Sequence, residues 1–162
     1  KTEVDDEKVQ LEEASFDPKK IYHIPFLWKE IKSEKVACTQ VIEALKILFR
    51  IQKSSSERIL FHCTAGEDRT GLLAGLFDQL LNKANEMSSF KYEMCEKGYS
   101  SGNRNKPAQV TREIDKNLTP LYFKMSELIL KNKISINKLN SSVCAELESL
   151  ELKEELATCD KL

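Results

Sequence analysis

Apolar residues recur at helical spacing between residues 34 and 53. A stripe repeating every three or four residues is typical of an amphipathic helix with one buried face. Ser33 is a favourable N-cap, because its hydroxyl accepts a hydrogen bond from a free N–H of the first turn. The pattern therefore predicts a helix up to about Lys53. Its inward face consists of Ala37, Val41, Leu45, Leu48 and Gln52, flanked by Cys38, Ile42 and Phe49.

Two short apolar runs on either side of this helix predict buried strands. IYHIPF, residues 21–26, stops near Pro25, and RILFHC, residues 58–63, has the continuous apolar character of a buried, often parallel, strand. A strand, a helix and a second strand form a β-α-β unit, which almost always has parallel strands and a right-handed crossover. We therefore predict an α/β fold with a central, mostly parallel sheet flanked by helices and with a helical C-terminal half.

The residues on either side of this unit are assigned by pattern and turn signals. The acidic opening stretch up to Lys20 contains a turn at Asp17-Pro18. A polar loop after residue 63 leads into a helix with a wide apolar face, which should be buried. Helices are predicted over residues 69–82, 87–97, 107–117, 119–131 and 141–156, with a loop over residues 98–106.

The composition is that of one globular domain. The chain has 162 residues, of which 41% are hydrophobic and 31% are charged, and its net charge is −1. Such a balance gives no reason to expect binding to nucleic acid or to an anionic membrane. No apolar run is long enough for a membrane span, and the first residues lack the layout of a signal peptide. We expect a single-domain monomer over residues 1–162, with a frayed tail at 157–162.

The cysteine pattern bears on the redox environment. The chain has five cysteines, at an odd count and wide spacing without a C-x-x-C pair, which argues against a disulfide scaffold and against a zinc site. We therefore expect a reducing, cytoplasmic location, with secretion as an effector as the alternative, and neither metal nor cofactor. Four of the cysteines are expected to be plain thiols: Cys38, Cys95, Cys144 and Cys159.

The most informative stretch is HCTAGEDRTG, residues 62–71, between a predicted strand and a predicted helix. It fits the pattern H-C-x-x-G-x-x-R-S/T-G at every specified position, and a chance match in such a chain has a probability of about one in a million. The matching residues are His62, Cys63, Gly66, Arg69, Thr70 and Gly71. On these residues the chain resembles the protein tyrosine phosphatase superfamily, with its dual-specificity and bacterial members. The resemblance is clear over residues 21–81, and the upstream strands of that fold are not evident.

This spacing has a physical reason. Five residues between Cys63 and Arg69 let the backbone curl so that its N–H groups converge at the electropositive start of a helix, where a phosphate dianion fits. Gly66 permits a backbone conformation closed to other residues. The same field lowers the pKa of the Cys63 thiol, and Arg69 offers a planar fork to two phosphoryl oxygens. The predicted phosphate cradle is Thr64, Ala65, Gly66, Glu67, Asp68 and Arg69.

The resemblance also implies roles for individual side chains. Cys63 is the nucleophile, which forms a phosphocysteine without a metal ion. Thr70 matches the hydroxyl that bonds the cysteine sulfur and eases its departure, and His62 matches a buried histidine that orients the loop. The Asp that many members carry after the first predicted strand is missing here. Asp68 resembles the loop Asp of the C-x-x-G-x-D-R variant and is the preferred general acid, with Glu30 as the alternative.

The expected substrate follows from the loop charges. Phosphoinositide-directed members often carry a Lys where this chain has Glu67, so a phosphotyrosine protein, with or without dual specificity, is favoured over an inositol lipid. A phosphoinositide remains the alternative, since four basic residues offer a rim for a polyanion. A phospho-binding pseudophosphatase is the second alternative, because of the missing Asp. The basic residues are Lys97, Arg104, Lys106 and Arg112.

Overall fold

The computed structural model describes residues 3–26, 28, 31–54, 58–64, 66–82 and 107–151. None of the helices within these ranges combines the length and the apolar composition that crossing a membrane requires. In chain order the elements are α1 (Glu3–Glu13), η1 (Pro18–Lys20), α2 (Glu34–Lys53), α3 (Asp68–Asn82), α5 (Ala108–Glu113), η4 (Ile114–Leu118), α6 (Thr119–Lys131), η5 (Ile136–Lys138) and η6 (Ser141–Ala145).

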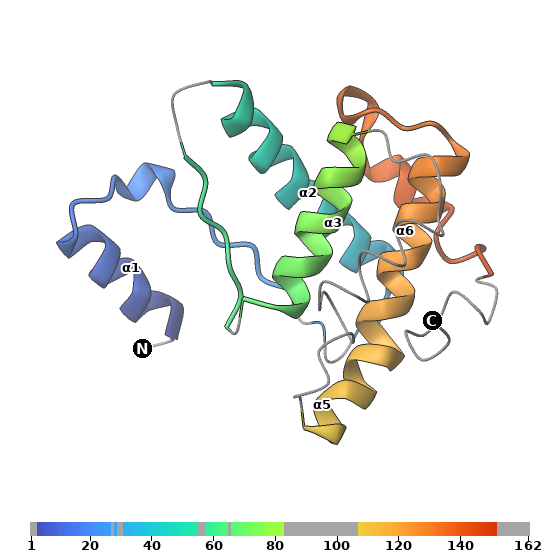
Figure 1. Ribbon diagram of the computed structural model, residues 1–162, viewed down its shortest axis with the longest axis horizontal. Helices are drawn as coiled ribbons and strands as arrows, with labels where there is room; N and C mark the ends of the chain where they lie inside the picture. Colours follow the sequence, from blue (N-terminus) through green and yellow to red (C-terminus); the bar gives the residue numbers. More distant parts are fainter. Residues whose placement is uncertain are drawn as a thin grey trace.

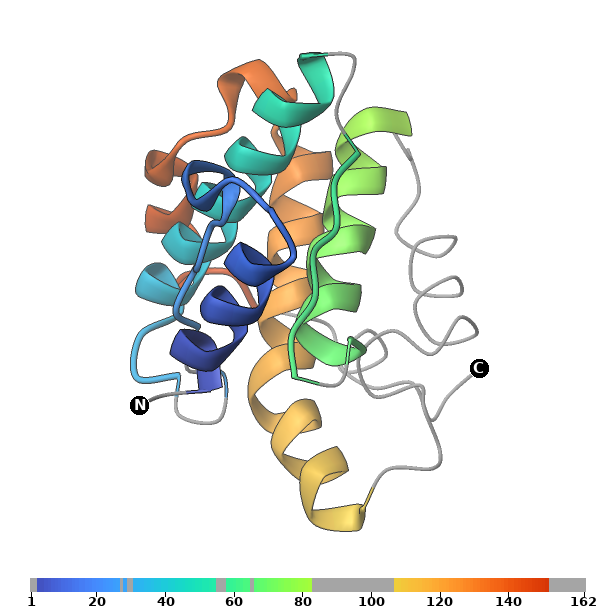
Figure 2. The same ribbon diagram turned by 90° about the vertical axis from the view of Figure 1, so that its left-hand side faces the viewer.

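The core lies where α2, α3 and α6 pack on one another. These helices run in the same general direction, and α3 and α6 lie side by side in both views (Figures 1 and 2). The Tyr122 and Phe123 rings of α6 meet with their centroids 5.7 Å apart. Each fully buried large apolar side chain contributes about 1.5–3 kcal/mol to folding. The largest of them are Tyr122, Phe123, Leu45, Leu72, Leu76, Ile114, Leu118, Leu121, Leu128 and Leu147.

The predictions for α2 and α3 are confirmed. Helix α2 begins at Glu34, and the Ser33 hydroxyl accepts a hydrogen bond from the Val36 N–H at 3.4 Å, as an N-cap does. The inward stripe of α2 is buried as expected up to Leu48, whereas Phe49 is half-buried and Gln52 is exposed. Helix α3 begins at Asp68, one residue before the predicted start, and buries Leu72 and Leu76. Apolar periodicity is a sufficient signal for both helices because both pack one face on the core.

The predicted break before Thr119 is replaced by a π-helical turn. Helices α5 and α6 are joined by η4 without interruption, and the N-cap position of α6 is Leu118, which makes no side-chain cap. The Thr119 N–H instead donates to the carbonyl of Ile114, five residues earlier. Pro120 explains this local widening, because proline has no N–H and its ring clashes with the preceding turn of an α-helix. The prediction of two separately capped helices was therefore wrong at this point.

The predicted central sheet is wrong. The described residues contain no strand, and the core is made by helices. The segments 21–26 and 58–63 are extended as predicted, but neither takes part in a ladder of backbone hydrogen bonds. Residues 58–63 connect α2 to α3, whose axes point the same way, so this stretch returns along the helices in an extended form (Figure 1). The predicted burial is also wrong, because no residue of either segment is buried and Leu60 is 84% exposed. An apolar run does not specify a pairing partner.

Two further differences lie near the ends of the described chain. The acidic opening stretch forms α1, with Glu3, Asp5 and Asp6 in its first turn, where negative charge is favourable. No residue of α1 is buried, so the sequence has no apolar stripe from which this helix could be predicted. Of the helix predicted over residues 141–156, the described part, 141–151, forms a short 3-10 helix, η6, followed by turns, and residues 152–156 lie outside the described residues. The predictions for residues 87–97, 98–106 and 157–162 lie outside the described residues.

A disulfide between Cys38 and Cys144 overturns the expectation that both are plain thiols. The bond joins α2 to η6 across 106 residues, with a Cα–Cα distance of 5.7 Å and both side chains fully buried. Spacing arguments cannot detect a pair brought together only by the packing of η6 on α2. Disulfides persist most readily in oxidising environments. The cysteine pattern therefore gives no support to a reducing compartment.

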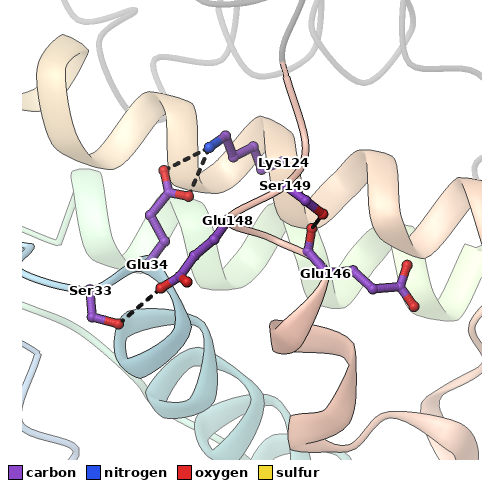
Figure 3. Close-up of polar contacts among 6 residues, drawn as sticks. All are labelled: Ser33, Glu34, Lys124, Glu146, Glu148 and Ser149. Carbon is purple, nitrogen blue, oxygen red and sulfur yellow. Dashed lines mark hydrogen bonds and ion pairs between the residues drawn. The ribbon is translucent and has the colours of Figure 1, made fainter.

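Polar contacts fasten the start of α2 to distant parts of the chain (Figure 3). The Lys124 ammonium of α6 lies 2.9 and 2.7 Å from the two carboxylate oxygens of Glu34. The Ser33 hydroxyl donates to the Glu148 carboxylate at 3.4 Å. Such partly exposed pairs contribute little to stability, about 0–1 kcal/mol each. Their position shows that the C-terminal turns lie against the first turn of α2.

Candidate active site

The extended segment 58–63 delivers Cys63 to the beginning of α3. Exposure alternates along it: Ile59, Phe61 and Cys63 are half-buried, whereas Leu60 and His62 on the other face are exposed, Leu60 to 84%. This is the period-two pattern of an extended chain with one face on the core. The thiol of Cys63 thus lies on the inward side, next to the N-terminus of α3.

Gly66 lets the chain turn between Cys63 and α3. Its φ angle is +71°, a left-handed conformation that residues with a Cβ rarely adopt, which confirms the role predicted for it. A methyl group there would have no heavy atom within 4 Å, so the requirement is one of backbone conformation alone. The turn ends where the Gly71 N–H donates to the Glu67 carbonyl at 2.6 Å and opens α3. Ala65 lies outside the described residues.

Arg69 folds back across the loop. Its Nη2 atom donates to the Thr64 hydroxyl at 3.1 Å, which joins the last residue of the predicted cradle to the first. Thr64 follows Cys63 directly, so the guanidinium contacts the neighbour of the cysteine in the chain. The N-terminus of α3 adds positive potential at this point. The arrangement is suited to an anion with several oxygens.

Thr70 ties the cysteine backbone to α3. Its hydroxyl accepts a hydrogen bond from the Cys63 N–H at 2.9 Å. The resemblance implies a bond from this hydroxyl to the sulfur, whereas the bond seen here is to the backbone. A hydroxyl can donate its proton while it accepts. Thr70 therefore holds Cys63 in place and keeps one proton available in its immediate vicinity.

His62 occupies a different environment from the buried one that was predicted. Its side chain is 50% exposed, because the extended segment directs residue 62 away from the core. Its Nδ1 lies 3.0 Å from the Cys63 carbonyl oxygen, and its Nε2 lies 2.7 Å from a carboxylate oxygen of Glu7 on α1. The bond to the Cys63 carbonyl has the largest effect and raises the pKa of His62. Burial opposes it, and the hydrogen bond and the charge of Glu7 raise the pKa further.

Sequence reasoning missed Glu7 altogether. It lies 55 residues before His62, in an acidic helix without a buried face, so no spacing or periodicity marks it. The only usable signal is that a histidine beside a nucleophile commonly has an acidic partner, and the opening stretch holds several candidates. The fold selects one of them by bringing α1 to the exposed face of segment 58–63.

The two candidate general acids are placed unequally. Asp68 is the first residue of α3 and is 9% exposed, next to Arg69 in the loop. Glu30, the alternative, lies outside the described residues. Glu67 of the cradle is half-buried. Of the basic residues considered for a rim, Arg112 lies on α5, and Lys97, Arg104 and Lys106 lie outside the described residues.

Comparison with known proteins connects this geometry to one family. The model of the tyrosine phosphatase family matches residues 7–151. The matched range begins within α1 and covers the loop, the helical core and the residues of η6. Neither the curated proteins nor the solved structures compared with the chain gave a match.

Proposed function

Since the chain belongs to the tyrosine phosphatase family, we propose that it hydrolyses phosphomonoesters through a phosphocysteine intermediate formed on Cys63. Family membership supports phosphatase activity in general. The observation that supports the proposal is the bond between Arg69 Nη2 and the hydroxyl of Thr64, the residue that follows the nucleophile in the chain. A phosphate bound there would contact the Cys63 sulfur, the Arg69 guanidinium and the N-terminus of α3.

The first step transfers the phosphoryl group to sulfur. The Cys63 thiolate attacks phosphorus, the S–P bond forms, and the bond from phosphorus to the leaving oxygen breaks. The leaving oxygen takes a proton from the general acid. Arg69 binds two of the phosphoryl oxygens and stabilises the charge that they gain. The backbone N–H groups of the cradle, from Thr64 to Asp68, stabilise the same charge.

The second step returns the enzyme to its starting state. Water attacks phosphorus and gives one proton to the carboxylate that acted as general acid in the first step, the S–P bond breaks, and inorganic phosphate leaves while the thiolate is regenerated. Thr70 assists, because its hydroxyl already accepts from the Cys63 N–H and retains a proton that can be donated to the departing sulfur. No step uses a metal ion, so turnover should not depend on added chelator.

Asp68 is our first choice for the general acid, with Glu30 second. Asp68 is the first residue of α3, stands next to Arg69 in the loop and is almost buried. The same position also suits a purely structural role, since negative charge is favourable in the first turn of a helix. A comparison of leaving groups distinguishes these roles and is described below.

The favoured substrate is a phosphotyrosine protein, with dual specificity as a variant of this proposal. Glu67 lies in the cradle and is half-buried, so its negative charge opposes a headgroup that carries several phosphates. A phosphoinositide is therefore the second choice. A pseudophosphatase that binds a phosphoprotein without hydrolysing it is the remaining alternative.

Turnover of p-nitrophenyl phosphate tests the proposal directly. Wild-type protein should release inorganic phosphate in the presence of EDTA, and Cys63→Ser should abolish release because the nucleophile is gone. Arg69→Ala should lower kcat/KM by about 10²–10³, the usual effect of removing one donor to a charged transition state. The melting temperature of both variants should match that of the wild type. Full activity in Cys63→Ser would contradict the mechanism.

A substrate panel separates the three substrate hypotheses. Phosphotyrosine peptides and phosphoinositide vesicles are each offered to the wild type and to Cys63→Ser. Faster phosphate release from the peptides supports a protein phosphatase, and faster release from the vesicles supports the lipid alternative. Tight peptide binding by the wild type without any release would identify a pseudophosphatase.

A further inference from the structure

An ion pair connects α1 to the residue before the nucleophile. Glu7 and His62 are 2.7 Å apart, and their side chains are 42% and 50% exposed. The second nitrogen of the same ring lies 3.0 Å from the Cys63 carbonyl oxygen. The imidazole thus bridges a helix that contributes nothing to the core and the backbone of the loop.

Both neighbours of the His62 ring can only accept hydrogen bonds. A carboxylate and a backbone carbonyl carry no proton to donate, whereas a neutral imidazole has one N–H only. Either neutral tautomer would therefore direct a nitrogen lone pair at one of these oxygens. The doubly protonated ring alone satisfies both contacts at once. The geometry accordingly requires a positively charged His62 while α1 is in place.

We propose that Glu7 is a positioning residue for the nucleophile: it holds His62 in its protonated form, and that cation orients the Cys63 backbone and stabilises the Cys63 thiolate. The proposal rests on the function assigned above to Cys63. Glu7 itself does not touch the reacting atoms, because it contacts Nε2 of the ring. The other ring nitrogen, Nδ1, faces the backbone carbonyl of Cys63.

The coupling between His62 and Cys63 acts in both directions. A negative charge on Cys63 raises the pKa of His62, and by linkage a charged His62 lowers the pKa of the Cys63 thiol to the same degree. Among the described residues, the groups that act on the His62 ring are the Glu7 carboxylate from α1 and the backbone and thiol of Cys63. Removal of Glu7 should therefore raise the pKa of the Cys63 thiol.

The pH window follows from the sign of the shift. The pKa of His62 lies above its ordinary value of 6.5. The ion pair between Glu7 and His62 is therefore fully present below pH 6.5. It is lost as the pH rises through the higher pKa that His62 has in the folded protein. Replacing Glu7 by an uncharged residue should bring this loss to lower pH.

The variant Glu7→Gln tests the proposal, with Glu12→Gln as the matched control. Both remove one carboxylate from α1, but only Glu7 contacts the loop. Proton NMR follows the two histidines, His62 and His23, in each protein. The pKa of His62 should fall in Glu7→Gln and remain unchanged in Glu12→Gln, and His23 should be unaffected in both.

The reactivity of Cys63 is measured in parallel by iodoacetamide labelling between pH 4 and pH 9. Quantifying the tryptic peptide of residues 59–69 by mass spectrometry isolates this cysteine from the others. In Glu7→Gln the acid limb of the labelling rate should move up by about 0.5–1 pH unit, so the rate on that limb falls by about three- to tenfold. The Glu12→Gln profile should overlay that of the wild type.

An unchanged pKa of His62 in Glu7→Gln would overturn the proposal. So would a lower pKa of His62 with an unaltered labelling profile, since the link to the sulfur would then be absent. Neither readout needs turnover. A protein that shows both shifts but releases no phosphate from any substrate would keep the role of Glu7 and refute the proposed hydrolysis instead.

Discussion

The helical core and the loop side of this molecule are held together by different forces. In the core, α2, α3 and α6 bury large apolar side chains completely and are joined to η6 by a disulfide. On the loop side, segment 58–63 and α1 are largely exposed and meet through polar contacts such as that between Glu7 and His62. Apolar burial contributes far more free energy than exposed polar pairs. Substitutions in the core should therefore change stability, and substitutions on the loop side should change rate.

The largest expected effect concerns the disulfide. Replacing both partners, Cys38→Ala with Cys144→Ala, opens a loop spanning 106 residues and should lower the free energy of unfolding by about 4–5 kcal/mol. Chemical unfolding in urea measures this loss. Turnover of p-nitrophenyl phosphate, assayed at a temperature where the variant is folded, should remain at the wild-type level.

Cys63→Ala is the matched substitution on the loop side. It removes a half-buried cysteine and should abolish turnover while leaving the urea midpoint close to that of the wild type. A large loss of activity in the folded Cys38/Cys144 double variant would break the comparison, because it would show that the core also sets the geometry of the loop.

The next prediction concerns Asp68, which lies where the loop joins α3, and it tests whether this residue acts in catalysis or in structure. If Asp68 protonates the leaving group, Asp68→Asn should slow the hydrolysis of alkyl phosphates by about 10²-fold or more and that of p-nitrophenyl phosphate by less than about tenfold. Alkoxides need the proton, whereas p-nitrophenolate leaves without it. Steady-state kinetics on both substrates measure the two ratios. Equal losses on both would assign Asp68 to the structure of α3.

The smallest effect belongs to Gly66. Alanine meets no neighbour there, but its φ of +71° costs a residue with a Cβ about 1–2 kcal/mol. This strain should disorder the loop and lower kcat/KM by about five- to thirtyfold, with little change in the melting temperature. Gly66→Asn is the control, since asparagine tolerates the left-handed region, and its kcat/KM should lie nearer to the wild type. A drop in melting temperature without a change in kcat/KM would contradict the assignment.

The sequence was sufficient where structure is local. Helices α2 and α3 follow from apolar stripes and from the cap at Ser33, and the loop follows from the spacing of Cys63, Gly66 and Arg69. Each of these depends on residues within about one turn of one another. The position of Arg69 over Thr64 is of the same kind, because five residues separate the two.

The sequence was insufficient where partners are remote. The Cys38–Cys144 bond and the Glu7–His62 pair join residues 106 and 55 positions apart, and only the packing of whole helices decides them. The predicted sheet failed for the same reason, because apolar runs cannot say whether an extended segment pairs with a strand or lies against helices. At Pro120 a local signal was misleading. The proline predicted a break between two helices, but a π-helical turn accommodates it and the helix continues.

The shared direction of α2, α3 and α6 has an electrical consequence. In bundles of alternating helices the peptide macrodipoles oppose one another, whereas here they add, with their positive poles gathered towards the end of the molecule where the Cys63 turn lies (Figure 1). Each pole is equivalent to about half an elementary charge. A chain whose formal charges nearly balance, at −1, thereby acquires a backbone polarity that orients an approaching dianion, most strongly in dilute salt.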